Sequence, residues 1–204
     1  MRLESASAFR NESPILEVLR GLLEDKRDII EIASGSGQHA AAFTQALPQL
    51  HWWPTDLGPR SIDSIEIWRA DSGSENFKPA RLLDVSGDDW RRGAALDGLP
   101  DEADGIVCVN MIHISPWSAT QGLFEGAAKR LASDGLLYTY GPYARDGRHT
   151  SEGNESFDAS LRAQNPDWGI RSLEDVERLG QSVGFRLDEL IEMPANNLSL
   201  VFRR

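Results

Sequence analysis

The stretch of residues 29–47 constrains the fold more than any other part of the chain. An apolar segment, Ile29-Ile30-Glu31-Ile32, runs into the small residues Ala33-Ser34-Gly35-Ser36-Gly37 and then into helix-forming residues. This pattern predicts a buried strand, a glycine turn and the start of a helix. Glycine allows a tight turn and the close approach of a ligand. Because the N–H groups of a first helical turn attract carboxylates and phosphates, we expect a ligand site here.

Apolar segments and amphipathic segments continue to alternate after this stretch. The pattern predicts strands over residues 28–33, 51–56, 80–85, 105–110 and 135–140. Helices are expected between them, over 38–47, 59–70 and 123–131, which is typical of a parallel sheet with helices on both faces. Two last strands, over 186–193 and 197–202, are joined by a connection short enough for a hairpin. We therefore predict an α/β fold with a Rossmann-like, doubly wound, seven-stranded sheet that is mostly parallel and includes a C-terminal antiparallel β-hairpin strand.

Two segments lie outside this alternation. Residues 1–12 are interpreted as a loose N-terminal arm, because Ser13-Pro14 has the composition of a helix start. Residues 141–168 are polar and too long for a plain connector, so we interpret them as a lid or substrate loop. The length of the chain indicates a single domain over residues 1–204.

Composition and charge narrow the choice of partners. The net charge of −11 disfavours nucleic acid and favours a small-molecule substrate. No stretch of 18 apolar residues is present, and Met1 to Ser7 lack the apolar core of a secretory signal. The single cysteine, Cys108, excludes internal disulfides, and the four histidines share no metal-binding spacing. We expect a cytoplasmic protein without a membrane segment or a metal; the oligomeric state is not indicated.

Polar residues follow the predicted strands where each strand ends. Asp56 ends the second strand, Asp84 lies near the end of the third, and Asn110 ends the fourth. Ligands of open α/β sheets bind at the carboxyl ends of the strands. Asp56 and Asp84 could instead be helix caps or solvated loop acids, but their shared position at strand ends favours a binding role.

These features together resemble a known group of proteins. The seven predicted strands with a final hairpin, the glycine turn and the two strand-end acids resemble the class I S-adenosyl-L-methionine (SAM)-dependent methyltransferases. The resemblance runs from about residue 9 to the C-terminus. Longer stretches are similar to domain-of-unknown-function family 938, a methyltransferase-like group whose substrate is not established: Arg10-Asn11, residues 32–39, residues 110–117, Tyr140-Gly141-Pro142-Tyr143 and residues 193–199.

The resemblance implies a cofactor and the residues that bind it. The cofactor would be SAM and the product S-adenosyl-L-homocysteine (SAH). Glu31, Gly35 and Gly37 would line the pocket for the amino-acid end of SAM, Asp56 would bind the ribose hydroxyls, and Asp84 and Val85 would lie beside the adenine. The other implied cofactor-binding positions are Arg10, Asn11, Ala33, His39, Leu57, Asn110 and Met111. Ala33 stands where the family has a glycine, and we expect it to adopt an ordinary φ.

Three residues are candidates for catalysis. A methyltransferase needs a base only if the acceptor must lose a proton. His113 is the first candidate, since an unperturbed imidazole titrates at about pH 6.5, and His149 in the polar segment is the second. Tyr143 is a candidate for closing over the substrate. The alternatives are a hydrogen-bonded loop histidine, a surface histidine and a packed tyrosine.

Two other functions compete with methyl transfer. Residues 35–40 satisfy the pattern G-x-G-x-x-A, and Asp56 follows at about the 20-residue spacing of a dinucleotide-binding acid, which would suit an NAD-dependent oxidoreductase. The closing hairpin and Asp84 favour SAM over NAD. The second competitor is a non-catalytic SAM-binding module that senses or scaffolds. The polar segment 141–168 favours a substrate pocket and therefore an enzyme.

Overall fold

The computed structural model describes residues 1–204, which form a seven-stranded sheet and a small two-stranded sheet. The strands of the large sheet are β1 (Asp28–Ile32), β2 (His51–Asp56), β3 (Arg81–Leu82), β4 (Ala103–Val109), β5 (Leu131–Gly141), β8 (Arg186–Met193) and β9 (Asn197–Arg203). The small sheet pairs β6 (Tyr143–Ala144) with β7 (Arg171–Ser172). The helices are α1 (Ala6–Leu22), α2 (Gln38–Ala46), α3 (Pro59–Ser72), α4 (Asp88–Arg92), α5 (Trp117–Arg130), α6 (Glu152–Gln164) and α7 (Leu173–Ser182), with a 3₁₀ turn at Pro194–Asn196.

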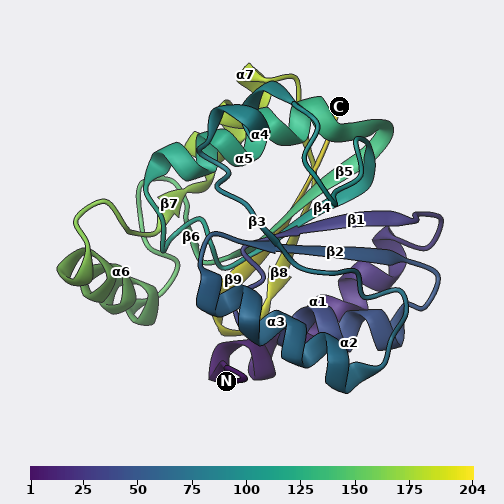
Figure 1. Cartoon of the computed structure of the whole chain (residues 1–204). Coiled ribbons are helices and arrows are strands. Elements are labelled where there is room, and N and C mark those ends of the chain that lie inside the picture. The colour runs from purple at the N-terminus through teal and green to yellow at the C-terminus, as the bar shows by residue number, and fades with distance from the viewer.

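The large sheet is doubly wound. Its strand order is β3-β2-β1-β4-β5-β9-β8, and β1 to β5 run parallel to one another. β9 is antiparallel to both of its neighbours, β5 and β8. Helices α1, α2 and α3 cover one face, and α4, α5 and α7 cover the other (Figure 1). The predicted fold class is confirmed.

Two cores hold the helices to the two faces of the sheet. On the face of α1 and α2, Phe43, Trp52 and Tyr138 are fully buried. On the face of α5 and α7, Phe124 and Phe202 pack edge to face with ring centroids 5.0 Å apart. Burial of such large side chains contributes roughly 1.5–3 kcal/mol each, so both layers are firmly attached and the strand ends between them are held in place.

The N-terminal segment is helical from Ala6 onward, so the prediction of a loose arm is wrong for residues 6–12. α1 begins at Ala6, and the Ser5 hydroxyl caps it by accepting a hydrogen bond from the Ala8 N–H at 3.3 Å. The helix continues through Pro14 and buries Ala8 and Asn11 on its inner side. Because Asn11 is polar, the apolar periodicity does not extend back to the true start of the helix.

The polar segment 141–168 also contains more regular structure than expected. It includes β6 and the helix α6, which Ser151 caps by accepting a hydrogen bond from the Asn154 N–H at 3.1 Å. The buried residues of α6 are Asn154, Asp158 and Leu161, two of which are polar. Because most of the buried residues of α6 are polar, its sequence has no apolar stripe that would predict a helix. The prediction of a loop is wrong for residues 152–164. The third strand is likewise shorter than predicted, at two residues.

None of the seven helices has both the length and the apolar character needed to cross a bilayer.

Candidate functional site

A cavity of about 470 Å³ lies at the carboxyl ends of β1, β2 and β4. Its volume is in the range of small-molecule and cofactor sites. The cavity brings together seven of the residues implicated by the sequence: Ala33, Gly35, Asp56, Leu57, Asp84, Val85 and Met111. These residues come from four separate loops, and the topology of the sheet places them at one edge.

The carboxylate of Asp56 is oriented by two backbone donors. Its Oδ2 accepts a hydrogen bond from the Gly35 N–H at 2.9 Å, and its Oδ1 accepts one from the Gly58 N–H at 2.9 Å. Each carboxylate oxygen has a further lone pair for a ligand hydroxyl. Gly35 has φ +59°, and the nearest atom to a Cβ built there would be 4.0 Å away, so the space above the turn is open. The turn and the acid therefore form one rigid unit.

Ala33 adopts a left-handed backbone conformation with φ +56°, so the expectation of an ordinary φ is wrong. Asn110, at the end of the neighbouring strand β4, has φ +62°. For alanine this conformation costs roughly 1–2 kcal/mol. Such strain in non-glycine residues clusters at binding sites, where the surrounding structure maintains it.

The far end of the cavity is suited to a flat, partly polar group. Asp84 is exposed, and its Oδ1 accepts hydrogen bonds from the Ser86 N–H at 2.8 Å and the Ser86 hydroxyl at 2.6 Å. This arrangement leaves Oδ2 available to a ligand. Leu57 lines the same cavity and is 67% exposed, so its apolar surface is open to a ligand.

Gly37 has a structural role that differs from the expected contact with ligand. It has φ +94°, and a Cβ at this position would lie 2.8 Å from Cα of Ile65. Glycine is therefore required for α2 to pack against α3. Gly37 lines neither of the two cavities at the strand ends, so its contact with a cofactor stays a prediction.

Glu31 and His39 lie behind the cavity wall and support it. Glu31 is 1% exposed, its Oε2 accepts a hydrogen bond from Trp52 Nε1 at 3.0 Å, and burial raises its pKa to about 7. Nε2 of His39 lies 2.8 Å from Oδ1 of Asn11, and burial lowers the pKa of His39 to about 4. Neither side chain lines either of these two cavities, so contact of Glu31 or His39 with a ligand stays a prediction, and the contacts seen in the structure are structural.

A second cavity of about 650 Å³ adjoins the first. Ile114 lines both of them, which places the two cavities side by side at this residue. The second cavity gathers four of the predicted site residues: Arg10, Asn11, Asn110 and His113. Its other walls come from α6 and from the turn between β8 and β9.

His113 is buried at the inner wall of the second cavity and is 4% exposed. Its ring lies edge to face with Phe157, with centroids 5.6 Å apart, and its backbone oxygen accepts a hydrogen bond from the Gly169 N–H at 3.0 Å. Burial, and then the nearby charge of Arg171, lower the pKa of His113 to about 4. The imidazole is therefore neutral at pH 7, and both its burial and the charge of Arg171 disfavour its protonated form.

The other two catalytic candidates do not reach either cavity. Tyr143 is 1% exposed, its hydroxyl lies 2.9 Å from Oγ1 of Thr139, and burial raises its pKa. His149 lies with Nε2 3.6 Å from Oδ2 of Asp158 on α6. The hydroxyl of Tyr143 is enclosed in the core and the ring of His149 faces Asp158, so both contacts are structural and the catalytic roles of the two residues stay predictions.

Several lining residues were missed by the sequence analysis. Asn154 and Phe157 belong to α6, which was not predicted because its buried face is largely polar. Asn197 is the first residue of β9. Ile114 and Tyr140 lie inside the stretches that carry the family resemblance, which is the one signal that could have identified them.

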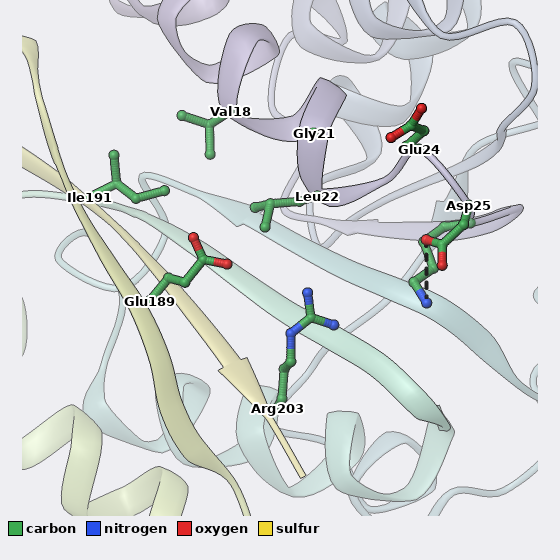
Figure 2. Close-up of a pocket in the computed structure, with 9 residues that line it drawn as sticks. Val18, Gly21, Leu22, Glu24, Asp25, Glu189, Ile191 and Arg203 are labelled. Atoms are coloured by element: carbon green, nitrogen blue, oxygen red, sulfur yellow. Dashed lines mark ion pairs between the residues drawn. The ribbon is translucent and has the colours of Figure 1, made fainter.

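A third hollow, of about 630 Å³, lies away from these residues (Figure 2). It is formed by the end of α1 with β8 and β9, where Val18, Leu22 and Ile191 lie close to Glu189 and Arg203. None of the predicted site residues lines it. It lies near the loop before β1, on the side where that strand begins, so it is separate from the candidate site.

The order of the strands identifies the fold. The seven-stranded sheet, with β9 antiparallel to its neighbours, has the Rossmann-like fold of solved methyltransferase structures. The chain belongs to the family described as "Protein of unknown function (DUF938)", whose model matches residues 2–204. The family that the sequence resembles is thereby confirmed.

Solved structures share this fold at low sequence identity. An O-methyltransferase family protein from Burkholderia thailandensis has a TM-score of 0.78 and 16% identity, over 97% of this chain and 57% of that one. The mitomycin 7-O-methyltransferase MmcR has a TM-score of 0.76 and 16% identity, over 98% and 54%. PigF, solved with SAH, has a TM-score of 0.76 and 14% identity, over 96% and 56%. The chain spans a little over half the length of these proteins.

Proposed function

We propose that the protein is a SAM-dependent methyltransferase that acts on a small-molecule acceptor, with residues 1–204 as a single domain. The observation that carries this proposal is the pair of adjoining cavities at Ile114. One cavity is lined by Asp56 and Asp84, whose carboxylates suit an adenosine, and the other contains a neutral histidine. Two of the structural neighbours described above, one named as an O-methyltransferase and one solved with SAH, support the same function.

The residues of the first cavity fit SAM. Asp56 has lone pairs for both ribose hydroxyls, and charge-assisted hydrogen bonds of this kind contribute roughly 1.5–3 kcal/mol each. Oδ2 of Asp84 would accept from the adenine amino group, and Leu57 would cover the base. The amino-acid end would extend toward Arg10, Asn11 and Asn110 in the second cavity.

The protein would contribute alignment and a candidate base. SAM supplies a methyl group on a sulfonium, which is already a good leaving group. Ile114 lines both cavities and Met111 lines the first, and these apolar side chains would exclude water where the cavities adjoin. If the acceptor carries a proton, His113 is the candidate base, and its lowered pKa makes it a weak one that hydrogen-bonds the acceptor more readily than it takes the proton. Positioning of the two reactants is expected to provide most of the rate enhancement.

Cofactor binding tests the proposal directly. Calorimetric titration with SAH, SAM and NAD is expected to give micromolar binding of the first two and none of NAD. Binding of NAD alone would instead indicate an NAD-dependent oxidoreductase. The fold comparisons favour the methyltransferase.

A SAM-binding sensor or scaffold would share the first cavity and must be tested separately. The second cavity with His113 favours an enzyme. Incubation of metabolite extracts with methyl-labelled SAM is expected to label a small molecule only when the protein is present. Failure to label any component of broad extracts, with SAH binding intact, would favour the sensor.

A further inference from the structure

The second cavity differs in charge from the rest of the chain. Of the 204 residues 32 are acidic, yet none of the 14 residues that line this cavity is Asp or Glu. Arg10 is its one lysine or arginine, and the proposed function assigns Arg10 to the carboxylate of the cofactor. The remaining lining side chains are uncharged at pH 7, His113 included. An acceptor with a net charge would therefore lose its hydration without gaining a counter-charge, which is costly.

Two large apolar side chains are left uncovered at the same place. Phe157 is 40% exposed and Ile114 is 43% exposed, and both line the second cavity. Uncovered apolar surface of this kind marks a binding site when it is gathered in a concave region. The ring of Phe157 is held edge to face against His113, so its orientation is defined before a ligand arrives. A flat apolar ligand would cover it.

One polar group in this cavity is prepared to accept a hydrogen bond. Asn154 is 8% exposed, and its Nδ2 donates to Oγ1 of Thr150 at 2.9 Å and to the backbone oxygen of Asn196 at 3.1 Å. Both amide hydrogens are therefore used, and Oδ1 is left as the acceptor. A ligand that donates a hydrogen bond would satisfy it.

We propose that the second cavity selects an uncharged, flat molecule with a hydrogen-bond donor, which packs on Phe157, donates to Asn154 on the same face of α6 and contacts Ile114. A phenol or an aromatic amide has this chemistry, whereas aromatic acids and amines carry a charge that the cavity does not neutralise. This inference rests on the proposed function for the assignment of Arg10. It goes further by naming the class of acceptor.

Three probes of similar shape test the charge selectivity. 4-Hydroxybenzamide is uncharged, 4-hydroxybenzoate is an anion, and 4-hydroxybenzamidine is a cation at pH 7. Each is titrated by ligand-observed NMR into protein saturated with SAH. The amide is expected to bind at least about fivefold more tightly than either charged probe, because only the charged probes lose uncompensated hydration.

A pair of phenylalanine variants tests the location. Phe157→Ala is expected to weaken binding of the amide at least about fivefold and to leave SAH affinity unchanged. Phe9→Ala is the matched control, because Phe9 is 78% exposed on α1 and lines neither cavity. It is expected to change neither affinity.

The outcomes separate the two proposals. If the wild-type protein does not bind SAH, the proposed function itself is overturned. If SAH binds and a charged probe binds as tightly as the amide, only the acceptor class is overturned. The same conclusion follows if the amide does not bind, or if Phe157→Ala and Phe9→Ala behave alike.

Discussion

The Gly35 N–H donates a hydrogen bond to Oδ2 of Asp56 across 2.9 Å, which joins two residues 21 positions apart in the sequence. The glycine turn and the strand-end acid are therefore parts of the same site. A carboxylate held in this way keeps one orientation before any ligand arrives. It follows that removal of the Asp56 side chain affects both the ligand contact and the geometry of the turn.

Asp56→Ala is expected to weaken SAH binding about tenfold or more, because charge-assisted hydrogen bonds to the ribose hydroxyls are lost. Calorimetric titration measures the change. Asp63→Ala is the control, since Asp63 is exposed on α3 and lines neither cavity. If Asp56→Ala binds SAH as tightly as the wild-type protein does, Asp56 does not contact the ligand.

Ala33→Gly is expected to raise the free energy of unfolding by about 0.5–1 kcal/mol. A φ of +56° strains alanine sterically and does not strain glycine. Glycine loses more conformational entropy on folding, which offsets part of this gain. Urea denaturation measures the difference. Ala40→Gly, inside α2, is the control and is expected to destabilise the protein. Destabilisation of Ala33→Gly by as much as the control would contradict strain at Ala33.

Arg10→Met is expected to weaken SAH binding about tenfold and to leave the binding of 5′-methylthioadenosine unchanged. The two ligands share the adenosine, and only SAH has the amino-acid carboxylate that Arg10 is proposed to hold. Arg60→Met, at an exposed position on α3, is the control. An equal loss of affinity for both ligands would place Arg10 elsewhere.

Arg171→Met is expected to raise the pKa of His113 from about 4 and to weaken SAH binding. Arg171 donates to the backbone oxygens of Ile112 at 3.4 Å and Ser115 at 2.7 Å, so it fixes the loop that lines both cavities. Its charge also disfavours the imidazolium. NMR titration of His113 measures the pKa. Arg171→Lys should keep the pKa low while the loop loses its forked contact, and an unchanged pKa in Arg171→Met would contradict the electrostatic effect.

Glu31→Gln is expected to stabilise the protein above pH 7 and to have little effect near pH 4.5. Burial raises the pKa of Glu31 to about 7 in the folded protein, against 4.5 for the ordinary value. Between these values the folded state binds more protons than the unfolded state, so the wild-type protein loses stability as the pH rises, by roughly 3 kcal/mol in total. Glutamine keeps an acceptor for Trp52 Nε1. Equal effects of the substitution on urea denaturation at pH 4.5 and pH 8 would contradict the raised pKa.

The sequence indicated the layers of the fold because these depend on local periodicity. Continuous apolar runs predict buried strands, and apolar residues spaced three or four positions apart predict helices that bury one face. The same logic failed for α6 and for the start of α1, where the buried positions include Asn154, Asp158 and Asn11. A polar residue is buried when a distant partner satisfies it, and such a partner does not show in the local pattern.

The sequence by itself determined the order of strands and helices along the chain, the glycine turn after β1, the acid that ends β2 and the acid that follows β3. Only the tertiary structure decided which side chains reach a cavity. In the folded protein Tyr143 is buried in the core, and His113 lines a cavity. Glu31 and His39 are buried and line neither of the two cavities. The physical reason is that burial, pKa and left-handed backbone at Ala33 arise from contacts between segments far apart in the chain, and these exist only after the sheet has formed.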